Sequence, residues 1–163
     1  MIKVGVITIS DKGSRGERED LSVEEIKKLI PRLSGQISAY TIVPDEESII
    51  IETLIAYADK EKLDLILTSG GTGLSPRDVT PEATQRVIER QVPGMAEAMR
   101  VESLKKTPLA MLSRGVVGTR GRSLIINLPG SPRAVRESLS TVLPAIPHAL
   151  EKLHGDPTEC GSP

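Results

Sequence analysis

A cluster of small polar residues in the middle of the chain has the composition of a phosphate-binding loop. Residues 68–73 read Thr-Ser-Gly-Gly-Thr-Gly and follow the largely apolar run Leu63–Leu67. Glycines let backbone N–H groups approach phosphate oxygens closely, and ligands of open α/β sheets bind where strands end. The loop is neither a P-loop nor a dinucleotide fingerprint, because Leu74-Ser75-Pro76 comes next. The sequence therefore predicts an anion site here, with a tight strand-to-loop turn as the alternative.

Two aspartates are placed to supply a metal site beside this loop. Asp78 precedes the Thr80-Pro81 pair, and Asp45 follows the second strand-like run. A carboxylate next to a phosphate cradle is unfavourable unless a cation intervenes, and Mg²⁺ is commonly held by one or two carboxylates plus substrate phosphates. We expect Asp45 and Asp78 to hold one Mg²⁺ between them. The alternatives are an N-cap for Asp45, and for Asp78 a helix-dipole contact or a surface pair with Arg77.

Three further segments carry polar groups that fit an anionic ligand. Ser10-Asp11 with Ser14 follows the first strand-like run, where an ordinary turn is the alternative. The turn after Asn127, formed by Pro129, Gly130, Ser131 and Pro132, opens a helix and fits a nucleotide site or simple capping. Ser113-Arg114 and the basic pair Arg120 and Arg122 could neutralise a polyphosphate, although Arg120 and Arg122 also fit a solvated turn.

The elements that must position these residues alternate along the chain. The β-branched runs 3–9, 37–43, 63–68 and 123–128 predict strands, and 108–117 predicts a short strand with a turn. Helical spacing follows Ser22, Ile49, Thr80, Pro93, Ser131 and Ala145, with a Ser22–Glu25 capping box and Thr80 as an N-cap. The pattern predicts a three-layer α/β/α sandwich with a mostly parallel central sheet. We expect one domain over residues 1–155 and a tail over 156–163.

Composition excludes several classes of partner. The chain has 163 residues, a net charge of −1 and two aromatic residues, so neither attraction to nucleic acid nor base stacking is expected. Cys160 is the single cysteine, so no internal disulfide forms. His148 and His154 lack the spacing of a zinc site. We see no signal peptide or membrane span and expect a cytoplasmic protein.

The ordered set of these motifs resembles the molybdopterin adenylyltransferase family, which includes the bacterial MogA and MoaB proteins, the plant Cnx G domain and the gephyrin G domain. The likeness spans roughly residues 3–155. Its motifs are 67–83 (LTSGGTGLSPRDVTPEA), 88–90, 93–94, 102–104, 111–114 and 125–132.

The resemblance implies the molybdopterin-binding fold, a homotrimer, and a reaction that belongs to molybdenum cofactor biosynthesis. In that reaction the terminal phosphate of molybdopterin attacks the α-phosphorus of ATP, and pyrophosphate leaves. Asp45 and Asp78 match the family's metal-binding catalytic aspartates, and Mg²⁺ is the expected ion. The family's phosphate-binding loop matches Gly70, Gly71, Thr72 and Gly73, its second turn near the ligand matches Pro129, Gly130, Ser131 and Pro132, and Ser103, Ser113 and Asn127 match positions near the pterin. The full set of expected substrate-binding residues adds Ser10, Asp11, Ser69 and Arg114, which the residues themselves suggest.

One departure and two alternatives accompany the resemblance. The family often has Asp-x-Ser-Gly where this chain has Asp20-Leu21-Ser22-Val23, so no role follows for Asp20 or Ser22. Molybdate insertion would need a separate protein. The alternative functions are molybdopterin binding without catalysis and hydrolysis of nucleotide pyrophosphates, as in competence-damage proteins.

Overall fold

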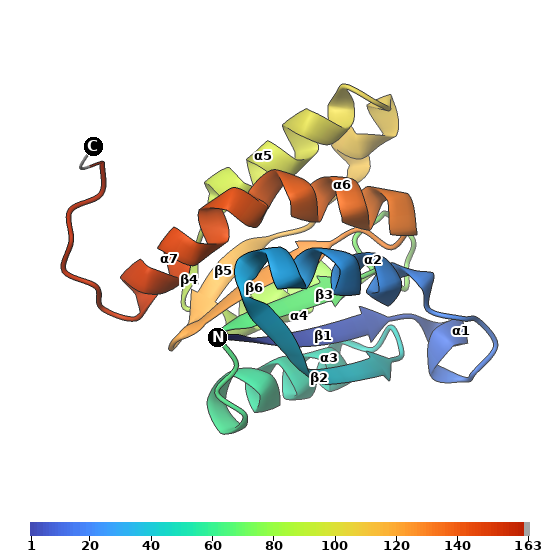
Figure 1. The fold of residues 1–163 in the computed structure, drawn as a ribbon. Coiled ribbons are helices and arrows are strands. Elements are labelled where there is room, and N and C mark those ends of the chain that lie inside the picture. Colours follow the sequence, from blue (N-terminus) through green and yellow to red (C-terminus); the bar gives the residue numbers. More distant parts are fainter. Residues whose placement is uncertain (162–163) are drawn as a thin grey trace.

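The computed structural model describes residues 1–161 and contains one six-stranded sheet in the order β2-β1-β3-β6-β5-β4 (Figure 1). The first four strands of that order are parallel, while β5 and β4 run antiparallel at one edge. This confirms the mostly parallel α/β prediction. The strands are β1 (Ile2–Ile9), β2 (Gly35–Val43), β3 (Leu65–Ser69), β4 (Arg90–Gln91), β5 (Val117–Arg120) and β6 (Ser123–Leu128).

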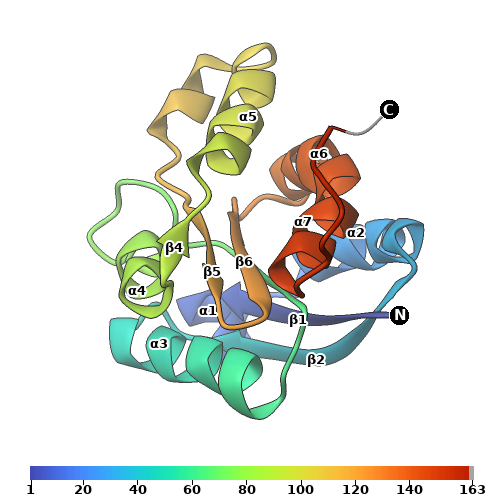
Figure 2. The same ribbon diagram turned by 90° about the vertical axis from the view of Figure 1, so that its left-hand side faces the viewer.

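Helices cover both faces of the sheet (Figure 2). One layer contains α2 (Leu21–Leu29), α5 (Pro93–Leu104), α6 (Pro132–Val142) and α7 (Ile146–Leu153), and the other contains α3 (Glu47–Ile55) and α4 (Thr80–Val87). Short turns complete the chain: the helical turn α1 (Asp11–Ser14), the 3-10 turns η1 (Ile30–Leu33), η3 (Pro108–Leu112) and η4 (Leu143–Ala145), and the π-helical turn η2 (Ala56–Lys60). No helix among residues 1–161 is both long and apolar enough to cross a membrane.

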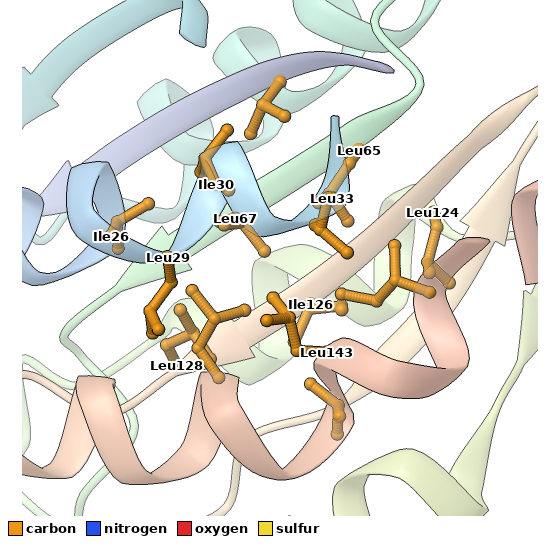
Figure 3. Close-up of a cluster of buried hydrophobic side chains, with 14 of the residues drawn as sticks. Ile26, Leu29, Ile30, Leu33, Leu65, Leu67, Leu124, Ile126, Leu128 and Leu143 are labelled. Atoms are coloured by element: carbon orange, nitrogen blue, oxygen red, sulfur yellow. The ribbon is translucent and has the colours of Figure 1, made fainter. Parts of the chain in front are cut away.

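Alternating side chains of the central strands fill two separate cores. Leu65 and Leu67 of β3 point into the larger core between the sheet and α2, α5, α6 and α7, part of which Figure 3 shows. Ile66, between them, points into the smaller core under α3 and α4. Every residue of β3 and β6 is buried, as expected for strands covered on both faces. Aliphatic side chains thus hold the sheet rigid beneath the loops that follow it.

Three local predictions were wrong. Asp20, not Ser22, caps α2, since its carboxylate accepts the N–H groups of Ser22 and Val23. Thr80 does not cap α4, because its hydroxyl donates to the carbonyl of Gly70 at 2.9 Å. The expected strand within 108–117 is instead η3, and the strand β5 begins at Val117.

The parallel strands bring four loops to one edge of the sheet. Thr8 of β1 is in register with Ser69 of β3, Ser69 with Leu128 of β6, and Ile9 with Val43 of β2. The segments after β1, β2, β3 and β6 therefore leave the sheet side by side. At the opposite edge β1 begins, and His154, just beyond α7, hydrogen-bonds the carbonyl of Arg122 at 3.0 Å.

Candidate active site

The glycine loop after β3 is a tight turn whose geometry requires glycine. Gly70 and Gly71 have φ values of +100° and +67°, which side-chain-bearing residues rarely adopt. A Cβ on Gly70 would clash with the carbonyl of Ile9, and one on Gly71 with the hydroxyl of Thr80. The N–H of Gly70 donates to the carbonyl of Leu128 at 3.2 Å, so this group is already used within the fold.

The N–H groups further along the loop are available for a ligand. Within residues 1–161, no protein acceptor takes the N–H of Gly71, Thr72 or Gly73. Consecutive N–H groups of this kind bind phosphate oxygens. Gly71 belongs to the tight turn and also has an N–H that is free within residues 1–161, so the two interpretations of the loop are compatible.

Asp45 and Asp78 lie against this loop and line the same cavity, which has a volume of about 590 Å³. A Cβ on Gly71 would lie 3.2 Å from Oδ1 of Asp45, and one on Gly73 would lie 2.9 Å from Oδ2 of Asp78. Each carboxylate thus faces one glycine, and a larger residue at either position would crowd it. The two aspartates, far apart in the sequence, converge at the glycine loop.

Asp45 is held by a reciprocal pair of hydrogen bonds with Asp11. The N–H of Asp11 donates to Oδ2 of Asp45 at 2.9 Å, and the N–H of Asp45 donates to Oδ1 of Asp11 at 3.0 Å. Arg77 donates two hydrogen bonds to the same Asp11 carboxylate, from Nε at 3.0 Å and from Nη2 at 2.9 Å. Asp45 is not the N-cap of α3, which follows Glu46, and Arg77 pairs with Asp11 rather than Asp78.

The electrostatics of the pair favour a cation. Burial raises the pKa of Asp45 above its ordinary value, and the negative charges of Asp11 and Asp78 act in the same direction. The Arg77 hydrogen bond instead lowers the pKa of Asp11. No three acidic, histidine or cysteine side chains of residues 1–161 form a metal cluster. The donor set is two carboxylates beside a phosphate-type loop, which fits a Mg²⁺ ion completed by substrate phosphates.

A second cavity, of about 210 Å³, lies between α5, η3 and the start of α6. Ser103, Ser113, Asn127 and Pro129 line it among mainly apolar neighbours. Gly130 and Ser131 line the first cavity, so the turn after β6 contributes to both.

The amide of Asn127 is committed inside the protein. It donates to the hydroxyls of Thr68 and Thr84 at 2.9 and 3.0 Å, and its oxygen accepts the N–H of Val116 at 3.2 Å. Its exposed fraction is 2%. These contacts tie β3, α4 and the start of β5 together under the second cavity. A direct contact of Asn127 with substrate stays a prediction.

The predicted site residues fall into three groups. They line the first cavity, the second cavity or neither. Arg114 is in the last group, and its guanidinium bonds the glycine loop and Glu82. The first cavity holds Ser10, Asp45, Ser69, Gly70, Gly71, Asp78, Gly130 and Ser131; the second holds Ser103, Ser113, Asn127 and Pro129; Asp11, Thr72, Gly73 and Arg114 line neither.

Sequence reasoning missed five charged residues that line the cavities, which are Arg18, Glu19 and Asp20 in the first and Arg100 and Glu137 in the second. Asp20 lies in the first cavity, where its Oδ2 accepts the hydroxyls of Thr8 and Tyr40 at 2.5 and 2.6 Å. Arg100 and Glu137 line the second cavity. Arg100 precedes Ser103 by three positions on the predicted helix, so helical spacing could have placed it on the same face.

Comparison with known proteins identifies the family. The family model described as "Probable molybdopterin binding domain" matches residues 5–148. The chain belongs to this family. The molybdopterin adenylyltransferase of Helicobacter pylori strain 26695 is 45% identical over 157 residues, covering 95% of this chain and 89% of that protein. The gephyrin of Dictyostelium discoideum is 45% identical over 164 residues, covering 94% of this chain and 23% of that protein.

Solved structures of the family agree with the fold. The crystal structure of the molybdopterin biosynthesis enzyme MoaB from Thermus thermophilus superimposes with a TM-score of 0.91 at 55% identity, covering 98% of this chain and 100% of that chain. The resemblance to the MogA, MoaB and gephyrin group, and the molybdopterin-binding fold that it implies, are therefore confirmed.

The loop geometry predicts that Gly71→Ala is more damaging than Gly121→Ala. Both glycines have positive φ, +67° and +52°, but a Cβ meets the Thr80 hydroxyl at position 71 and nothing within 4 Å at position 121. The backbone strain of about 1–2 kcal/mol is shared, and overpacking adds about 1–3 kcal/mol at position 71 alone. Urea denaturation should show this difference in unfolding free energy; equal losses would contradict the contact.

The raised pKa of Asp45 predicts a stability gain for Asp45→Asn in metal-free buffer. A group whose pKa is raised on folding contributes stability below its ordinary value, here 3.8, and loses that contribution as pH rises through the raised value. Asparagine keeps an oxygen for the Asp11 N–H and removes the charge. Melting temperatures should therefore favour Asp45→Asn at pH 7, with the gain shrinking as pH falls towards 3.8.

Asp59→Asn is the matched control for this experiment. The Arg120 hydrogen bond lowers the pKa of Asp59, so the sign is opposite and the variant should gain nothing at pH 7. A wild-type protein that melts above Asp45→Asn at pH 7 without metal would contradict the electrostatic interpretation.

Proposed function

We propose that the protein transfers the adenylyl group of Mg-ATP to the terminal phosphate of molybdopterin. The observation that carries this proposal is the pairing of two carboxylates with a glycine loop in one cavity, next to a second, more apolar cavity. Two adjoining sites suit a reaction between two substrates. The names of the curated relatives support the same activity.

The two cavities suggest which substrate each one takes. The first offers Asp45, Asp78 and the N–H of Gly71, which suit a metal-bound polyphosphate. The second offers hydroxyls at Ser103 and Ser113 among apolar side chains, which suits a flat pterin ring. The turn of Pro129 to Ser131 lies where the two substrates would meet.

The chemistry needs positioning and charge neutralisation more than a general base. The nucleophile is a phosphate that is already ionised, so no protein group must remove a proton. A new P–O bond forms between this phosphate and the α-phosphorus of ATP, and the bond to pyrophosphate breaks. Donors from the loop stabilise the charge on the transferred group. Bound Mg²⁺ would neutralise the phosphates and polarise the reacting one.

The proposal predicts that turnover depends on both aspartates. Asp45→Asn and Asp78→Asn should each lower the rate of adenylylated pterin formation by about 100-fold or more, because each removes an anionic metal ligand. Pyrophosphate release is measured with Mg-ATP in the presence and absence of molybdopterin. Asp59→Asn is the control, since Asp59 pairs with Arg120 and lines neither cavity.

The outcomes separate the alternative functions. Wild-type protein that binds the pterin tightly but forms no adenylylated product would indicate binding without catalysis. Release of products from a nucleotide pyrophosphate in the absence of pterin would indicate a hydrolase. Full rate in either aspartate variant would refute its metal role.

We also propose a homotrimer, with a surface formed by α5 and η3 as an interface. Val101, Leu104, Leu109, Met111 and Leu112 are exposed there, Leu109 by 70%. The segment of α5 and η3 projects from the rest of the molecule (Figure 1). A grouping of large apolar side chains on one such segment is typical of a protein–protein contact. Two other expectations stay predictions: that a separate protein inserts molybdate, and that the protein is cytoplasmic.

Light scattering after size-exclusion chromatography tests the trimer. The native protein should have the mass of three chains, and Leu109→Glu should shift towards one chain, because a buried charge opposes association. Leu74→Glu changes a leucine of similar exposure, 65%, outside α5 and η3, and should leave the mass unchanged. A native protein of single-chain mass would refute this part of the proposal.

A further inference from the structure

The side chain of Arg114 is bonded to the glycine loop and to α4 rather than directed at either cavity. Its Nε donates to the carbonyl of Gly73 at 2.8 Å and its Nη2 to the carbonyl of Asp78 at 2.9 Å. Its Nη1 pairs with Oε1 of Glu82, and its backbone N–H donates to the carbonyl of Thr72 at 2.9 Å. One residue therefore holds the loop at three carbonyls.

These bonds fix a segment whose other side-chain anchors are the ion pair of Arg77 with Asp11 and the bond between Ser75 and Asp78. Residues 74–77 are exposed, and within the loop Asp78 bonds only to Ser75, whose N–H donates to its Oδ2 at 3.0 Å and whose carbonyl accepts its N–H at 2.9 Å. The bonds from Arg114 at Gly73 and Asp78 lie on either side of the exposed stretch. Arg114 thus holds the backbone of Asp78 itself, from which the carboxylate projects.

The positive charge of Arg114 is balanced by the carboxylate of Glu82. Glu82 accepts its ion pair through Oε1, and the other carboxylate oxygen of Glu82 is buried without a hydrogen-bond partner. Burial acts to raise the pKa of Glu82, but the Arg114 bond and a backbone N–H bring it below its ordinary value. Because Glu82 stays ionised, the pair offers little net positive charge to a polyphosphate.

The backbone around Arg114 is also part of the second cavity. Ser113 and Gly115 line that cavity, and the carbonyls of both accept Nη1 of Arg100, at 3.4 and 2.9 Å. The residue that bonds the loop of the first cavity thus lies, in the chain, between two residues that line the second.

We infer that Arg114 is a positioning residue that holds Asp78 in place for the metal by bonding the backbone of the glycine loop, and does not itself contact the ATP phosphates. The inference rests on the proposed function and departs from the polyphosphate-neutralising role expected from the sequence. It predicts that Arg114 affects ATP binding through the metal alone.

Binding of ATP with and without Mg²⁺ tests this distinction. Arg114→Met should weaken Mg-ATP binding by about tenfold or more in isothermal titration, because a displaced Asp78 no longer meets the ion. Binding of ATP in EDTA should stay within about twofold of wild type. If Arg114 contacts the phosphates directly, the EDTA measurement falls by a similar factor, and the inference is overturned.

Asp78→Asn supplies an internal check on the same measurement. If Arg114 acts through Asp78, adding Arg114→Met to Asp78→Asn should cost little further Mg-ATP affinity. A double variant whose losses simply add would contradict an action through Asp78.

Two further variants guard against a loss of fold. Glu82→Gln removes the charge that pairs with Arg114 and should lower Mg-ATP affinity, by a smaller factor than Arg114→Met. It tests the inference if Arg114→Met does not fold. Arg120→Met is the matched control, since Arg120 also bonds a carboxylate and a carbonyl, those of Asp59 and Val87, but lines neither cavity. It should bind Mg-ATP as the wild type does.

Turnover separates this inference from the proposed function. Wild-type protein without adenylyl transfer, but with metal-dependent ATP binding that Arg114→Met weakens, would refute the proposed function and keep the inference. Transfer at the wild-type rate and unchanged Mg-ATP affinity in Arg114→Met would keep the proposed function and refute the inference.

Discussion

The arrangement of this site depends on the repulsion between carboxylates gathered at the end of a buried sheet. Asp11, Asp45 and Asp78 converge there, and Asp45 is desolvated enough for its pKa to rise. The fold offsets part of this cost by setting Arg77 against Asp11 and by directing N–H groups at the carboxylates. The remaining unfavourable charge faces the cavity, where a cation would relieve it.

Both backbone groups and side chains hold the glycine loop in place. Thr80 and Leu128 hold the first half of the loop by hydrogen bonds at Gly70, while Arg114 holds the second half. Basic side chains near a phosphate site are usually interpreted as phosphate ligands. Here two arginines are bonded to the protein itself: Arg77 ties the loop to Asp11, and Arg114 bonds the loop backbone at Gly73 and Asp78.

The sequence was sufficient for the fold because the fold follows from periodicity. Runs such as 63–68 and 123–128 are too short for helices and too apolar for a half-exposed sheet, so a parallel sheet between two helical layers was predictable. The convergence of Asp45 and Asp78 followed from strand order, because parallel strands end at one edge. Local caps were less predictable: Asp20 and Ser22 both suit an N-cap, and only three-dimensional contacts decide between them.

The roles of individual polar residues were the least accessible from sequence. Asn127 lies in a motif that suggests ligand binding, yet its amide is bonded to Thr68 and Thr84, which are distant in the chain. Arg114 has the charge expected of a phosphate ligand, but its partners Gly73 and Glu82 become visible only when α4 packs beside the loop. Such assignments depend on long-range contacts, which composition and spacing do not encode.

The position of the two ends of the domain bears on how it is used in larger proteins. β1 begins at the edge of the sheet opposite the four loops. His154, just after α7, contacts Arg122 at the same edge. A polypeptide joined at either end would therefore emerge behind the cavities and leave their mouths open. Such a placement would let a unit of this kind be joined to further segments in a longer protein, such as the Dictyostelium gephyrin of which this chain matches 23%.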